Sequence, residues 1–266
     1  LYEFNGNTYE KISYDLSNER FYSRDSKIVP LSEVAPKESV AAISNVLTTQ
    51  SSLFAKTAKI YPKTNAITIT LNNNKNGTRI IYLDKKNRTA STDYVPTPVK
   101  DFANAPITSL KTNSFILGHV IYSMAVSNKQ LVLDIQDLTD KRVLKSIKFD
   151  GNEASVFKTT KNSITAVGPV LLEKTKTVEQ TEKSKAFFRR LKNSFYAGVY
   201  VKEEDSRIML KIGGYTPVRN NGGGISMISP GSVSAGTDNF GNVHITSTAP
   251  MYSNSFWYNG PGISFS

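Results

Sequence analysis

Apolar and polar residues alternate over several short stretches of this chain, and the longest series of such stretches spans residues 114–149. Residues 131–136 read Leu-Val-Leu-Asp-Ile-Gln, which is the period-two pattern of a half-buried strand. Turns are expected at Asn128-Lys129, because asparagine tolerates positive φ, and at the polar residues 139–141. The span predicts four strands, with His119 in the first. Such a unit has the size of a β-propeller blade or a four-stranded meander, and two ordinary hairpins of a β-sandwich fit it nearly as well.

Two more hairpins are predicted from the same kind of alternation. In residues 65–84, an alternating run is followed by Asn76-Gly77, a strong hairpin-turn signal, and then by a second apolar run. The other hairpin spans residues 195–215, with a charged turn at residues 202–206. Residues 85–105 are rich in proline and are expected to form a loop or an edge crossing.

Two short helices are expected to pack on these strands. The first is predicted over residues 36–49, where apolar residues recur at helical spacing after a proline. The second is predicted over residues 177–195, where Thr177 and Gln180 have the spacing of a capping box. The fold class predicted is therefore mainly β, either propeller-like or a large antiparallel meander or sandwich, with two short helices. The apolar stripes of the helices are Val40, Ile43 and Leu47, and Ala186, Phe187 and Leu191 with Phe195 or Phe188.

The composition of the chain changes abruptly at residue 216. From there to residue 266 only Arg219 and Asp238 carry a formal charge, and half of the 16 glycines lie in this stretch. Its apolar residues are too many for a solvated tether, and no helix or hairpin that would bury them is evident. We therefore expect a β-rich domain over residues 1–215 and a charge-poor insertion, or the start of a further β segment, over residues 216–266. The first residue is leucine, so a processed or partially ordered product is expected, and the strand-like alternation of residues 263–266 predicts that the natural chain continues beyond them.

The segment 216–266 contains the residues that we expect to bind a partner protein. Its apolar side chains need a surface to bury them, and the aromatic run near its end has the composition of an interface anchor or of a platform for a sugar ring. Packing at the edge of a sheet is the alternative explanation for that run. The predicted partner-binding residues are Ile225, Met227, Ile228, Val233, Phe256, Trp257 and Tyr258.

The net charge of +11 means that the surface field attracts anions. Basic residues gather on the second predicted helix around Phe187 and Phe188, which is typical of a face that binds anionic lipid or polysaccharide. The same pattern also fits the solvated side of a helix that packs its aromatic stripe on a sheet. Nucleic acid is not an expected partner, because the sequence has none of the usual nucleic-acid-binding modules. The predicted anion or lipid surface is formed by Lys185, Arg189, Arg190 and Lys192.

No motif in the chain predicts catalysis. Residues 231–237 have the glycine spacing of a phosphate loop but lack its lysine, and no G-x-S-x-G elbow occurs. Both histidines, His119 and His244, fall in predicted strands, and the neighbouring carboxylates of Asp134 and Asp137 have no distinctive spacing. Cysteine is absent, which excludes disulfides, thiolate chemistry and cysteine zinc sites. We expect no enzymatic activity, no cofactor and no metal site.

Three stretches carry a resemblance: AKIYPKTNAITITL (residues 58–71), RIMLKIGGY (Arg207–Tyr215) and the Gly/Ser/Met-rich segment that follows it. Together they resemble a group of envelope proteins of Bacteroidota-type Gram-negative bacteria. The resemblance covers roughly the middle two thirds of the chain and implies a β-rich fold and export to the periplasm or the cell surface, with or without a lipid anchor in the outer membrane. It implies no activity and no catalytic residue.

The sequence therefore predicts an exported envelope protein that binds another protein, as an accessory subunit of an outer-membrane complex. The charge-poor segment 216–266 is the main reason for this prediction. The alternative function is a glycan-binding or glycan-processing surface module, which the positive charge and the aromatic run favour.

Overall fold

The computed structural model describes residues 2–5, 8–35, 40–43, 54–98, 102, 106, 109–151, 158–165, 174–181, 184–204, 207–215, 218–219, 225–226, 234–237, 243–246 and 252–258. Side chains are described for residues 8–35, 40–43, 54–98, 102, 106, 109–151, 185–203 and 208–214.

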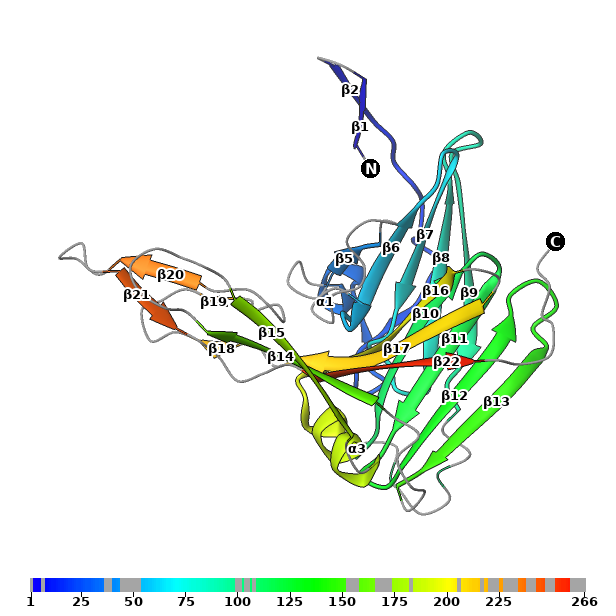
Figure 1. Ribbon diagram of the computed structural model, residues 1–266. Coiled ribbons are helices and arrows are strands. Elements are labelled where there is room, and N and C mark those ends of the chain that lie inside the picture. Colours follow the sequence, from blue (N-terminus) through cyan, green and yellow to red (C-terminus); the bar gives the residue numbers. More distant parts are fainter. Residues whose placement is uncertain are drawn as a thin grey trace.

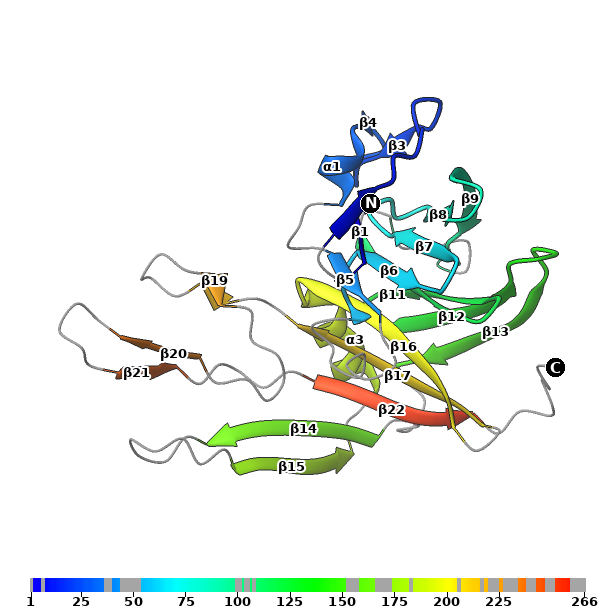
Figure 2. The same ribbon diagram turned by 90° about the horizontal axis from the view of Figure 1, so that it is seen from above.

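Three sheets form the body of the protein and confirm the predicted mainly β fold (Figures 1 and 2). We call them the first, middle and third sheets in chain order. The first has the strand order β5-β6-β7-β8-β9, the middle β10-β11-β12-β13, and the third β15-β14-β22-β17-β16. All pairings are antiparallel except that of β5 with β6. A propeller, one of the two expected arrangements, is not confirmed.

The middle sheet is the meander predicted from residues 114–149. Its turns fall where turn residues were expected, at residues 128–129 and at residues 139–141, where Lys141 has a φ of 61°. The prediction that His119 lies in the first strand is wrong. Gly118, with a φ of 64°, and His119 form the turn between the first two strands. The strands are β10 (Lys111–Leu117), β11 (Val120–Val126), β12 (Gln130–Asp137) and β13 (Val143–Asp150).

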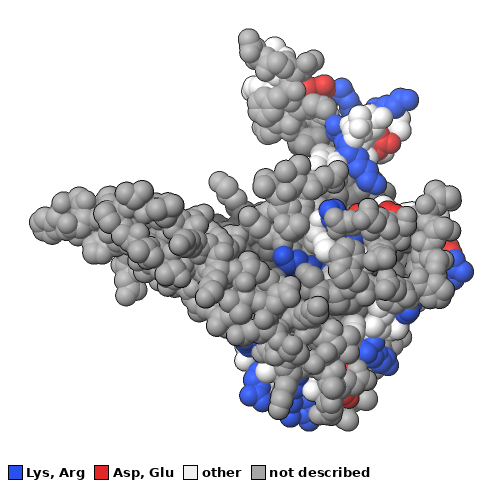
Figure 3. All heavy atoms as spheres, in the orientation of Figure 1, with Lys and Arg blue, Asp and Glu red and all other residues white. Residues whose placement is uncertain are grey.

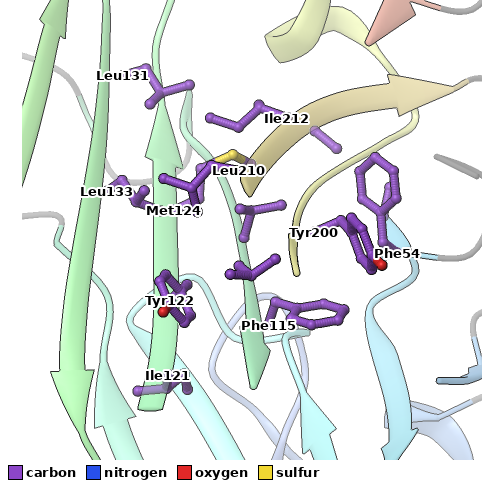
Figure 4. Close-up of a cluster of buried hydrophobic side chains, with 14 of the residues drawn as sticks. Phe54, Phe115, Ile121, Tyr122, Met124, Leu131, Leu133, Tyr200, Leu210 and Ile212 are labelled. Atoms are coloured by element: carbon purple, nitrogen blue, oxygen red, sulfur yellow. The ribbon is translucent and has the colours of Figure 1, made fainter. Parts of the chain in front are cut away.

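Both faces of the middle sheet are covered, so that every residue of β11 is buried. On one face, Met124 and Leu133 lie beside Leu210 and Ile212 of the third sheet (Figure 4). On the other face, Phe102 and Leu110 cover Ala125 and Val132. This second cover explains why Val132 is buried, although the alternating pattern predicted that this side of β12 would face water.

The first sheet contains the predicted hairpin of residues 65–84, as β7 (Ala66–Leu71) and β8 (Gly77–Asp84). The expected loop at residues 85–105 is wrong in part, since β9 (Thr89–Pro96) pairs with β8. An edge strand tolerates the missing N–H of Pro96 at its end. A second cluster that includes Phe21 and Val34 covers the outer face of this sheet. The first sheet also contains β6 (Ala58–Pro62). The elements that precede this sheet in the chain are β1 (Tyr2–Asn5), β2 (Thr8–Lys11), β3 (Phe21–Tyr22), β4 (Ile28–Val29) and α1 (Leu31–Val34).

The predicted helix at residues 36–49 is wrong where it is described. Val40–Ala42 form β5, which pairs in parallel with β6, and a β-branched valine suits such an edge position. Residues 36–39 and 44–49 lie outside the described residues. A short helix, α1, occurs before this region instead.

The second predicted helix is confirmed as α3 (Ser184–Asn193), but its expected start is wrong. The residues with capping-box spacing belong to β15 (Lys174–Thr181), which pairs with β14 (Lys158–Thr165). Phe187, Phe188 and Leu191 are buried against the main core, as the apolar stripe predicted. Ala186 is exposed, and Phe195 lies beyond the end of the helix with 59% of its surface exposed.

The third sheet combines the predicted hairpin of residues 195–215 with a strand from the charge-poor segment. The hairpin is β16 (Tyr196–Glu204) and β17 (Arg207–Tyr215). β22 (Tyr252–Tyr258) pairs with β14 on one side and β17 on the other, so it is not the edge strand considered for the aromatic run. The other strands of the segment form two ribbons: β18 (Val218–Arg219) with β19 (Ile225–Ser226), and β20 (Ser234–Thr237) with β21 (Val243–Thr246).

Candidate anion-binding site

A pocket of about 190 Å³ lies where the first sheet, the middle sheet and the start of β16 meet. Three cationic side chains line it: Arg24, Lys75 and Lys111. Among the described residues, no aspartate or glutamate lines this pocket. Its uncharged polar lining residues are Thr57, Asn72, Asn73, Thr112 and Asn113.

Each of the three cations comes from a different part of the fold. Arg24 lies in the turn between β3 and β4, and Lys75 lies in the turn between β7 and β8. Lys111 is the first residue of β10, and its Nζ donates a hydrogen bond of 3.1 Å to the carbonyl oxygen of Phe195. Lys75 is only 8% exposed. The fold therefore brings a buried lysine, a half-buried lysine and an exposed arginine to the same pocket.

The cations of the pocket repel one another. Burial lowers the pKa of Lys75 to about 8, and the charges of Arg24, Lys111 and Lys192 act in the same direction, against a smaller opposing effect of Asp25. The pKa of Lys111 is also lowered, first by burial and then by Arg24 and Lys192. Since burial and like charge both disfavour the protonated amine, an anion in the pocket would relieve part of this cost.

Asn113 fixes the floor of the pocket. Its side-chain amide donates to the carbonyl oxygens of Ala55 at 3.0 Å, Lys56 at 3.3 Å and Ala197 at 2.8 Å. Its side-chain oxygen accepts hydrogen bonds from the Lys59 ammonium and from the Ser114 N–H. One buried side chain thus connects the segment before β6 with β10 and β16.

Asn72 fixes a second wall through another buried network. Its side-chain oxygen accepts hydrogen bonds of 2.8 Å from the hydroxyls of Thr78 and Ser114. Its amide donates to the carbonyl oxygen of Thr57 at 3.2 Å. Because satisfied buried networks rigidify their surroundings, the pocket is preformed on this side.

Lys59 is completely buried beneath the pocket. Its Nζ donates to the carbonyl oxygen of Lys56 at 2.9 Å and to Asn113, and burial holds its pKa well below the usual value of 10.5. The unfolded chain therefore binds more protons than the folded chain between the lowered pKa and about 10.5. Stability is expected to rise with pH across that window.

Lys59→Met is expected to stabilise the protein by about 1–3 kcal/mol at pH 6, because it removes a buried amine whose protonation is costly. Both acceptors keep a donor, since Asn113 still donates to Lys56 and Ser114 still donates to Asn113. The gain should shrink as the pH rises toward 10. Urea unfolding at several pH values measures it, with the exposed Lys63→Met as the control. A gain that does not change with pH would show that Lys59 does not titrate on unfolding.

The predicted anion surface lies on α3, outside the pocket lining, and one of its residues acts on the cations of the pocket. Lys185 and Arg189 are exposed, and Lys and Arg side chains gather over α3 at the lower end of the molecule (Figure 3). Arg190 is half-buried. Lys192 is also half-buried, and its charge acts on both Lys75 and Lys111. The basic helix thus adds to the positive field of the pocket.

The predicted partner-binding residues are divided among separate parts of the fold. Ile225 belongs to the small sheet of β18 and β19, whereas Phe256, Trp257 and Tyr258 belong to β22. In the register of the third sheet, these three pair with Leu210, Met209 and Ile208 in turn. Met227, Ile228 and Val233 lie outside the described residues.

His119 and His244, the two histidines considered for catalysis, lie in separate elements of the described structure. His119 lies in the turn between β10 and β11, where its Nε2 is 3.5 Å from Oδ2 of Asp137 at the end of β12, and His244 lies in β21. Asp134 and Asp137 are three positions apart on β12, so they lie on opposite faces of the strand. Within the described residues, no group of three or more metal-ligating side chains is found. None of the described helices is both long and apolar enough to span a membrane.

The pocket residues were missed because they are far apart in the sequence. Lys75 lies in a run of turn residues, where its sequence context indicates only a hairpin turn. Lys59 alternates with Ala58 and Ile60 and shares the face of the buried Tyr61, which is a detectable signal of a buried lysine.

Comparison with known protein families, curated proteins and solved structures finds no match for this chain.

Proposed function

We propose that this protein is a binding protein for an anionic ligand, which it takes in the pocket of Arg24, Lys75 and Lys111. The observation that supports this is the convergence of three cations from separate segments on one recess, which no acidic residue of the described part of the chain lines. Such an arrangement is costly to the free protein, and an anionic group that enters it offsets the repulsion. Export to the periplasm or the cell surface is part of the proposal on the basis of the resemblance alone.

The double variant Lys75→Met/Lys111→Met tests the proposal. Hydrogen bonds to charged groups contribute about 1.5–3 kcal/mol each, so loss of two of them should lower the affinity for inorganic sulfate by about 100-fold or more. The variant should stay folded, since it removes mutual repulsion. Calorimetric titration at constant ionic strength measures the affinity.

The matched control is Lys63→Met/Lys148→Met, which changes the net charge equally at two exposed lysines outside the pocket. It should bind sulfate within about twofold of the parent protein, because the overall field changes little and the pocket is intact. Equal losses in the two double variants would mean that net charge, and not the pocket, attracts sulfate.

A second candidate function is the binding of another protein, as an accessory subunit, through the segment 216–266. The observation that favours it is that β20 and β21 pair only with each other among the described strands and extend away from the three sheets in both views (Figures 1 and 2). Deleting residues 220–237 should abolish co-purification of the partner from detergent-solubilised membranes without lowering the melting temperature. Unchanged co-purification would eliminate this role for the segment.

A further inference from the structure

One wall of the pocket is aromatic. Phe195 lines the pocket with 59% of its surface exposed, and its ring packs edge-on against Tyr196 with 4.7 Å between the ring centroids. The ammonium of Lys56 lies 5.2 Å from the centre of the Tyr196 ring. Tyr196 thus contacts both Phe195 and Lys56, and Phe195 places a partly exposed apolar ring in the same pocket lining as the cations. Lys111 donates to the Phe195 carbonyl oxygen, which ties this ring to the charged group next to it.

The pocket also contains an acceptor that lacks a donor. The side-chain oxygen of Asn73 is buried and accepts no hydrogen bond from any described residue. An unsatisfied buried acceptor costs free energy. An anion offers it no hydrogen-bond donor, so anion binding alone does not explain why this acceptor is present. Asn73 lines the pocket, so a ligand that donates a hydrogen bond, such as a hydroxyl group, would satisfy this oxygen once the amide turns it toward the ligand.

These features together select a ligand class. The cations require an anionic group, Asn73 requires a donor, and Phe195 favours an apolar ring face. The pocket is smaller than the 300–1,000 Å³ that is typical of sites for drug-sized ligands and cofactors, so it fits one small ring unit better than a whole nucleotide. A sugar with a carboxylate or sulfate group has an anion, hydroxyl donors and a face of C–H groups that stacks on aromatic rings.

We propose that the pocket binds one acidic sugar residue of a polysaccharide, with its anionic group on Arg24, Lys75 and Lys111 and one ring face against Phe195. This inference rests on the proposed anion binding and specifies its ligand. The hydroxyls of the same sugar reach Asn73. Neighbouring sugars of the chain extend out of the pocket past the exposed side of Phe195.

The test is calorimetric titration with four probes: trigalacturonic acid, a neutral galactose trisaccharide, adenosine monophosphate and inorganic sulfate. Trigalacturonic acid should bind at least tenfold more tightly than each of the others. Phe195→Ala should lower its affinity about tenfold and leave that of sulfate within twofold, since the variant removes only the stacking surface. Tyr94→Ala, which removes an aromatic ring that is 43% exposed outside this pocket, is the matched control.

The outcomes separate this inference from the function on which it rests. The sugar assignment alone is overturned if the Lys75→Met/Lys111→Met variant abolishes sulfate binding while the parent protein shows no preference for trigalacturonic acid. The same holds if Phe195→Ala does not change the affinity for trigalacturonic acid. Tighter binding of adenosine monophosphate than of trigalacturonic acid also overturns it, in favour of a nucleotide. Absence of binding by all four probes overturns both proposals. Asn73→Ala gives a second reading, because it should weaken trigalacturonic acid binding and spare sulfate binding.

Discussion

Asn113→Leu is expected to lower the free energy of unfolding by about 3–6 kcal/mol, since each buried polar group that loses its partner costs about 1–3 kcal/mol. The variant removes the donor to the carbonyl oxygens of Ala55 and Ala197 and an acceptor of the buried Lys59 ammonium. Leucine has a similar volume, so the loss would arise from polar groups and not from a cavity. The expected change is a large part of the stability of an ordinary domain.

Urea unfolding followed by circular dichroism measures this loss. Asn87→Leu is the matched control, because Asn87 is exposed and its side-chain bond to Asp84, 2.8 Å long, lies at the surface. The control should change the stability by less than about 1 kcal/mol. If the two variants were equally stable, Asn113 would not be the connection between the segment before β6, β10 and β16.

Gly198→Ala is expected to destabilise the protein by about 1–3 kcal/mol, and Gly198→Val by more. A Cβ atom at this position would lie 2.6 Å from the Cα atom of Ala55 and 2.7 Å from the carbonyl oxygen of Phe54. Both contacts are with backbone, which cannot move aside as a flexible side chain does. Because Ala55 and Ala197 line the pocket, the same displacement should also weaken sulfate binding.

Thermal unfolding and sulfate titration of the two glycine variants test this close approach. Ser91→Ala, at an exposed position of the edge strand β9, is the control and should change the stability by less than about 0.5 kcal/mol. A Gly198→Val variant with the melting temperature of the parent would show that β16 and the segment at Phe54 are not in backbone contact.

Local patterns predicted the parts of the fold that local interactions determine. The meander of residues 114–149 and the hairpin around Asn76-Gly77 follow from alternation and turn chemistry, and both are confirmed. Alternation gave no information on what covers the second face of a sheet, so the burial of Val132 was missed.

The errors in the helix predictions have a common cause. Apolar residues near Val40 and the polar pair Thr177 and Gln180 have helical spacing, yet residues 40–42 and 174–181 form strands that pair with β6 and β14. Helical spacing over so few residues is a weak preference, and hydrogen bonding to an available strand outweighs it. The sequence does not reveal which neighbouring strand is available.

The candidate site was not predicted, because it depends on contacts between distant segments. Arg24, Lys75 and Lys111 are separated by long stretches of chain, and each is unremarkable among the 33 lysine and arginine residues. Only the fold brings them together. The basic helix was recognised from the sequence, and Lys192 links it to the pocket through its effect on Lys75 and Lys111.

Proton uptake on sulfate binding is the most direct test of the anion-binding pocket. Sulfate does not titrate near neutral pH, whereas Lys75 has a pKa of about 8 that a bound anion must raise. Calorimetric titration at pH 8, in buffers with different heats of ionisation and at constant ionic strength, should show uptake of protons and an affinity that falls as the pH rises. Lys75→Met should abolish the uptake. Absence of binding, or binding without proton uptake and with no dependence on pH, would contradict the account.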